Sequence, residues 1–135
     1  MNKLIAYFCF ILISQSLWAL SGDSLLSHKD SYGFFYFYSS GCPHCQHFAP
    51  VLKNYSDLRG FSVLAISMDG GYLNEFPNAR VDQGQSKVFS VKTLPALFLV
   101  NPKKNKAILV SEGAIDLDEL SRRVKKVFDT EGDVA

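Results

Sequence analysis

The chain has 135 residues, 47% of them hydrophobic and 20% charged, and its formal net charge at pH 7 is +1. This balance is typical of one globular domain with a buried core, and it excludes a disordered or fibrous chain. Phosphate contacts need an excess of basic side chains, so we expect no nucleic-acid partner.

The first nineteen residues differ in kind from the rest. A positive start ending at Lys3 precedes an apolar run from Leu4 to Ile13, and Ala19 offers a small residue for cleavage. This order predicts a secretory signal peptide over 1–19, followed by a short leader over 20–31. An uncleaved membrane anchor is the alternative, although a spanning helix needs about 20 predominantly apolar residues.

The first half of the domain reads as strand, helix, strand. An aromatic run from Gly33 to Tyr38 predicts a strand, which Ser39-Ser40-Gly41 ends. Apolar residues then recur at helical spacing to about Leu58, which predicts a helix with Pro50 inside it. Phe61 to Ser67 reads as a buried second strand, and the order of the three elements predicts a parallel crossover.

The second half begins with turn residues over 68–84, which predict one long surface loop. A short helix over 85–91 leads to a third strand, Ala96 to Val100, and a polar turn connects it to an antiparallel fourth strand, Lys106 to Ser111. Asp116 is suited to cap a closing amphipathic helix that ends at Phe128, before a flexible tail over 129–135. We therefore expect an α/β domain over 32–128, with a central mixed sheet of about four strands flanked by helices.

Two cysteines stand where the first strand gives way to the helix, in the order Cys42-Pro43-His44-Cys45. A helix start favours an anion, and the attacking species in disulfide exchange is the thiolate. Cys9 would leave with the signal peptide, so the exported chain would carry only this pair. A purely structural disulfide explains the pair poorly. The stabilisation that a disulfide gives grows with the logarithm of the length of the loop it closes, and this loop has only a few residues. We therefore predict a redox-active Cys42–Cys45 disulfide.

The two thiols have different expected roles. Cys42 falls on the exposed helix N-terminus and is the expected nucleophile, whereas Cys45, one turn further in, is the resolving thiol. His44, when protonated, would stabilise the Cys42 thiolate. Zinc binding by the cysteines with His44 or His47 is the alternative, but the other half of a four-ligand set is missing, so we expect neither a metal nor a cofactor.

The order of these elements resembles the thioredoxin superfamily over Tyr32 to Phe128. Pro50 lies five residues after the second cysteine, where thioredoxins kink this helix. Leu94-Pro95 lies where they carry a cis proline that faces the disulfide, and Gly113 lies at the bend after the hairpin. The resemblance implies a minimal thioredoxin fold in which Leu94, Pro95 and Gly41 border the substrate.

Within that superfamily, the chain resembles the thioredoxin-like pilus-assembly and disulfide-isomerase proteins of F-type conjugative transfer systems, the TraF/TrbB group. The stretches that carry this resemblance are 38–43, 67–70, 76–78, 82–85 and 95–102. It implies a periplasmic oxidoreductase that forms or reshuffles disulfides in exported proteins, with transfer proteins as partners; we expect a monomer. The chain departs from the group in a short N-terminal extension and in having Leu94 where isomerases often have threonine.

Two further features favour oxidation or isomerisation over reduction. Pro43-His44 resembles the dipeptide of strongly oxidising periplasmic enzymes, and Tyr36 replaces the buried Asp with which thioredoxins take the proton from the resolving thiol. A reductase fed by a membrane redox partner and a non-catalytic assembly factor remain the alternatives. Asp69 and Asp82 are interpreted as turn residues rather than acid/base groups.

Overall fold

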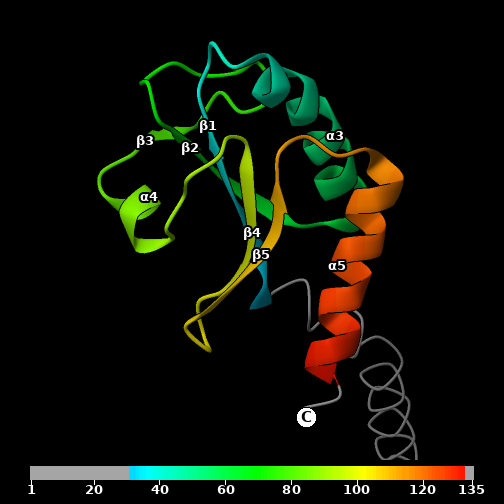
Figure 1. Cartoon of the computed structure of the whole chain (residues 1–135). Coiled ribbons are helices and arrows are strands. Elements are labelled where there is room, and N and C mark those ends of the chain that lie inside the picture. Colours follow the sequence, from blue (N-terminus) through cyan, green and yellow to red (C-terminus); the bar gives the residue numbers. More distant parts are fainter. Residues whose placement is uncertain (1–30, 133–135) are drawn as a thin grey trace, which may run out of the picture.

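A mixed sheet forms the centre of the domain in the computed structural model, which describes residues 31–132 (Figure 1). Within this range five strands occur in the order β3-β2-β1-β4-β5. Their bounds are β1 Gly33–Tyr38, β2 Ser62–Ser67, β3 Arg80–Val81, β4 Ala96–Asn101 and β5 Lys106–Glu112. β1 runs parallel to β2 and antiparallel to β4, β2 runs parallel to β3, and β5 runs antiparallel to β4. The described helices are α3 Pro43–Arg59, α4 Gln85–Val88 and α5 Leu117–Gly132.

Most aromatic residues of β1 are buried because helices cover both faces of the sheet. Figure 1 shows α3 and α5 on one face and α4 on the other. Side chains alternate between the faces of a strand. Accordingly, Phe34, Tyr36 and Tyr38 belong to the larger core, which includes buried residues of α3 and α5. Phe37 belongs to a smaller core on the opposite face, where Phe89 packs just after α4.

The register of the strands determines where the cysteine pair lies. Because β1 and β2 are parallel, their carboxyl ends meet at one edge of the sheet, where the Met68 N–H donates to the Tyr38 carbonyl at 2.8 Å. At the same edge, the first residue of antiparallel β4, Ala96, pairs with Phe37. Three chain segments therefore converge there: the turn after Tyr38, the loop after β2 and the residues before β4.

Several predicted boundaries require correction. The long loop over 68–84 contains β3, whose two exposed residues pair with the end of β2. A two-residue strand carries no readable periodicity, so the sheet has five strands where about four were expected. The short helix α4 ends at Val88 rather than at 91. α5 continues past Phe128 to Gly132, so the first residues of the predicted tail are helical.

Helix α3 has well-defined ends. It is preceded by Cys42 and followed by its cap Gly60, which has a left-handed φ of 76° and donates its N–H to the Ser56 carbonyl at 2.8 Å. Pro50 lies inside this helix, as the sequence predicts, and it is exposed.

The predicted signal peptide over 1–19 and the leader over 20–31 fall outside the described residues, apart from Ser31. In the part of the chain that the structure describes, no helix has both the length and the apolar character that a bilayer crossing requires.

Candidate functional site

Cys42 caps the N-terminus of α3 with its own sulfur. Its backbone is extended, with φ −83° and ψ 116°, and its Sγ accepts the backbone N–H of Cys45 at 3.2 Å. Pro43 occupies the start of the helix, where a missing N–H leaves no donor unpaired. No acidic side chain lies in the first turn. The Cys45 N–H and the positive end of the helix dipole therefore lie at the Cys42 sulfur.

The second thiol is in a different environment. Cys45 is fully buried, whereas Cys42 is half-buried, and both are free thiols. Burial disfavours the thiolate and, with a smaller effect of the hydrogen bond to Cys42, raises the pKa of Cys45 to about 12. The exposed sulfur is therefore the one that another molecule can reach, and the buried sulfur holds its proton.

Tyr36 lies against the Cys45 backbone rather than near open solvent. Its hydroxyl donates to the Cys45 carbonyl at 2.7 Å, and its ring stacks on Tyr38 with centroids 5.5 Å apart. Desolvation by burial raises the pKa of Tyr36 above its usual value, which is already well above neutral. The phenol therefore keeps its proton and remains a donor at neutral pH. At the position where thioredoxins carry a proton-accepting carboxylate, this chain therefore has a protonated phenol.

The predicted cis proline is present. The Leu94–Pro95 peptide bond is cis, and the Pro95 carbonyl accepts the N–H of Gly113 at 2.7 Å. Pro95 directly precedes Ala96, which pairs with Phe37, so it lies beside the carboxyl end of β1. Leu94 and Cys42 pack against the same core cluster.

Around Cys42 the surface is open. Gly41, Pro43, His44 and His47 are all exposed. Close by, a recess of about 290 Å³ lies between the segment around the cysteine motif and the loop after β2. Its lining residues are Ser40, Gln46, Tyr72, Leu73, Asn74 and Glu75. A larger hollow, between α3 and the 74–79 loop, includes neither cysteine and belongs to a different part of the surface.

Asp69, interpreted from the sequence as a turn residue, contacts the turn that precedes Cys42. Its carboxylate accepts the Ser40 backbone N–H at 3.1 Å and the Ser40 hydroxyl at 2.7 Å. Those hydrogen bonds, the Ser40 hydroxyl first, hold the pKa of Asp69 well below its usual range. A signal was available, because residues that follow parallel neighbouring strands meet at one edge, and Asp69 follows β2 as the cysteine motif follows β1.

Metal-binding side chains are not gathered at this site. Within residues 31–132, no group of three or more His, Cys, Asp or Glu side chains is arranged to hold an ion.

Solved structures with the same fold include the exposed lipoprotein thioredoxin of Streptococcus pneumoniae, with a TM-score of 0.58 and 18% identity over 76% of this chain and 89% of that chain. The thioredoxin domain of a thiol-disulfide oxidoreductase from Bacteroides vulgatus gives a TM-score of 0.54 and 18% identity, over 76% and 83%. The chain therefore has the thioredoxin fold, with a Cys-x-x-Cys pair at the start of α3.

Sequence comparison defines the family more closely. The family model described as TraF, F plasmid transfer operon protein, matches residues 21–125. Protein TraF of Escherichia coli K12 is 35% identical over 98 residues, which cover 73% of this chain and 40% of that protein. Protein TrbB of the same organism is 35% identical over 101 residues, covering 71% and 55%. The chain belongs to the TraF family, and its match spans about half the length of these relatives or less.

Proposed function

We propose that this protein is a periplasmic thiol-disulfide oxidoreductase, acting as an oxidase or isomerase on exported proteins of a conjugative transfer or pilus-assembly system. The observation that carries the proposal is the asymmetric pair at the start of α3: a reachable Cys42 sulfur that caps the helix and a fully buried Cys45 one turn further in. Membership of the TraF family supports the transfer system as its setting.

In isomerisation, the Cys42 thiolate attacks one sulfur of a substrate disulfide. A mixed disulfide forms, and the second substrate sulfur leaves as a thiolate. Another substrate thiolate then attacks the substrate sulfur of the mixed disulfide, so a new substrate disulfide forms and Cys42 is released with no net electron transfer.

Oxidation begins from the Cys42–Cys45 disulfide. A substrate thiolate attacks the Cys42 sulfur, and Cys45 takes the displaced electron pair and a proton. A second substrate thiolate then displaces Cys42, so the substrate loses two electrons and the cysteine pair gains them. Pro95 and Leu94, beside Gly41, are the proposed border for the substrate strand, and His44 is the proposed cation near the thiolate.

The surroundings of Cys45 favour reshuffling over reduction. A reductase resolves its mixed disulfide when the second thiol loses its proton and attacks. Here that thiol is fully buried, its pKa is raised to about 12, and the Tyr36 hydroxyl donates to the Cys45 backbone carbonyl and so offers no base. Slow attack by Cys45 on the mixed disulfide leaves that disulfide available to a second substrate thiol.

A redox titration of the purified protein against glutathione tests the direction of electron flow. We expect a reduction potential well above that of thioredoxin, and a value near about −270 mV would contradict the oxidising role and favour a reductase fed by a membrane partner. Thiol trapping in cells separates the same alternatives, because the reductase predicts a pair that is mostly reduced.

Replacing Cys42 and Cys45 by serine distinguishes an enzyme from an assembly factor. We expect pilus assembly and DNA transfer to fall in the double variant. Unchanged transfer would mean that the domain acts only as a scaffold.

The purified wild-type protein should sediment as a monomer and should bind neither metal nor nucleic acid. When recovered from periplasm it should begin after residue 19, which N-terminal sequencing would check.

A further inference from the structure

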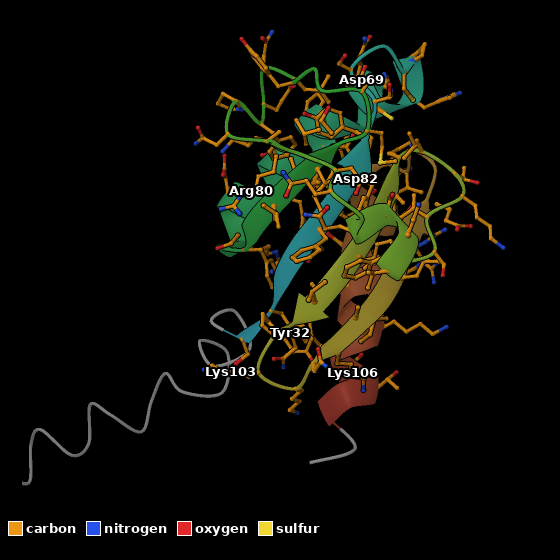
Figure 2. All side chains as sticks on the ribbon, turned by 90° about the vertical axis from the view of Figure 1, so that its left-hand side faces the viewer. Tyr32, Asp69, Arg80, Asp82, Lys103 and Lys106 are labelled. Atoms are coloured by element: carbon orange, nitrogen blue, oxygen red, sulfur yellow. The ribbon has the colours of Figure 1, made fainter. Side chains whose placement is uncertain are left out.

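One carboxylate connects the loop after β2 with the turn that precedes Cys42. Besides the two groups of Ser40, Asp69 accepts the hydroxyl of Ser39 at 3.1 Å. Figure 2 shows Asp69 at the end of the molecule where α3 begins. From its own side of the sheet, the same carboxylate receives the Ser67 hydroxyl at 3.0 Å and the Gly71 N–H at 3.1 Å. Asp69 is thus anchored at the end of β2 and holds the turn.

Ser40 is also restrained from two other directions. The side-chain amide of Gln46, in α3, donates to the Ser40 carbonyl at 2.7 Å. Gly71 packs so closely that an added Cβ would lie 2.7 Å from the Ser40 Cβ, closer than real atoms approach. The turn itself closes through the Cys42 N–H, which donates to the Ser39 carbonyl at 3.2 Å. The conformation from which the chain enters the helix cap is therefore fixed mainly by groups outside the cysteine motif.

We propose that Asp69 is a positioning residue for Cys42, which holds the Ser39–Ser40 turn so that the Cys42 sulfur stays on the α3 N-terminus. This inference rests on the proposed disulfide exchange. In the disulfide form, the covalent bond to Cys45 restrains Cys42. In the dithiol form, the turn and one N–H···S contact do so. Asp69 therefore stabilises the attacking dithiol form more than the disulfide form.

The low pKa of Asp69 is consistent with this role. Hydrogen bonds from Ser40 come first among its causes, followed by those from Gly71 and Ser67. The carboxylate therefore remains ionised, and the turn remains held, at neutral and mildly acidic pH.

Asp69→Asn is compared with Asp82→Asn, a control with the same change in charge. Asp82 accepts the Ser86 N–H at 3.0 Å and the Ser86 hydroxyl at 2.6 Å at the start of α4, so it also holds a local turn. In Figure 2, Asp69 lies near the top of the view and Asp82 lies lower, toward the middle of the molecule. The readouts on the full chain are the rate at which the dithiol form attacks oxidised glutathione, the equilibrium constant of the pair with glutathione, and the melting temperature.

We expect Asp69→Asn to slow the attack about tenfold, because catalysis depends on near-ångström placement of the reacting atom. We also expect its equilibrium constant to shift about fivefold toward the disulfide, since the dithiol form loses more. Asp82→Asn should leave the rate and the equilibrium constant within twofold of the wild type. This difference between the two variants should persist even if they melt at the same temperature. Equal rates and equal equilibrium constants in the two variants would overturn the proposal.

Two milder pairs keep the test decisive if Asp69→Asn fails to fold. Ser40→Ala, matched with Ser86→Ala, removes one hydroxyl donor from each carboxylate. Gly71→Ala displaces Ser40 without changing charge, so it should slow exchange as Asp69→Asn does if placement is the cause. A Ser40→Ala variant as fast as Ser86→Ala would refute the role of Asp69. If the wild-type protein undergoes no thiol–disulfide exchange at all, the proposed function is refuted instead.

Discussion

The different environments of two chemically identical side chains determine what the Cys42–Cys45 pair can do. Cys42 reaches solvent and receives an N–H from the helix backbone, whereas Cys45 faces the core and the Tyr36 phenol makes contact with its carbonyl. The sequence anticipates that Cys42 is exposed at the helix start and that Cys45 lies one turn further in, but not which groups surround Cys45. The protonation of Cys45 depends on burial and so on the packed core.

The resolving step should depend steeply on pH. Below a pKa of about 12, the thiolate fraction of Cys45 rises about tenfold per pH unit. Decay of a mixed disulfide between Cys42 and a small thiol, followed by mass spectrometry from pH 7 to 9, should accelerate by nearly that factor for each pH unit. Cys45→Ser should remove the intramolecular path and accumulate the mixed disulfide. A rate independent of pH would mean that another group removes the proton.

Tyr36→Phe should separate the hydroxyl from the ring. The ring contacts with Tyr38, Phe48 and Phe76 remain, but the buried Cys45 carbonyl loses its donor, which should cost about 1 kcal/mol of unfolding free energy. Urea unfolding measures this cost. Phe34→Tyr is unsuitable as a control because it would bury a new hydroxyl; Tyr55→Phe, a residue of α3 that also lies in the core, is preferable. Equal stability of wild type and Tyr36→Phe would show that the hydrogen bond contributes nothing net.

At the scale of elements, strength of pattern decides what the sequence can predict. β1, β4 and the end of α3 are predicted to within one residue because long apolar runs and turn residues bound them. β3 escapes prediction because its two exposed residues become a strand only through pairing with Ile66 and Ser67. α5 exceeds its predicted end because its last turn packs no apolar residue that a periodicity would reveal, although Gly132 is a typical helix terminator.

The end of α3 gives a prediction for an element boundary. Gly60→Ala places a Cβ on a residue with φ 76°, which should lower the free energy of unfolding by about 1 kcal/mol. Gly41→Ala is the control for stability, because nothing lies within 4 Å of its added Cβ and its φ is not left-handed. Both are measured by thermal or urea unfolding. Equal losses in the two variants would contradict a cost specific to the left-handed conformation.

For the whole molecule, acid should be destabilising. The pKa values of Asp69 and Asp82 are lowered, mainly by hydrogen bonds from serines, and that of Glu119 is lowered to about 2 by Arg122 and Arg123. The unfolded carboxyls titrate near about 4, so the unfolded state binds more protons below that pH. The stabilisation is complete above about pH 5 and is lost as the pH falls toward the folded pKa values.

Melting temperatures from pH 7 to 2.5 test this expectation. The wild type should change little down to about pH 5 and then fall, and Glu119→Gln should melt lower at neutral pH but lose less on acidification. A melting temperature that rises below pH 4 would contradict the sign of these shifts.

The sequence by itself determined the class of the domain, the order of nearly all its elements and the cysteine pair, because these depend on local pattern, spacing and motif. The cis proline followed only from the resemblance to thioredoxins. Only the tertiary structure decided the five-stranded sheet, the surroundings of Cys45 and the contact of Asp69 with Ser40. Asp69 and Ser40 are 29 positions apart. No local pattern relates such residues, and they meet because parallel pairing of β1 and β2 brings the ends of both strands to one edge of the sheet.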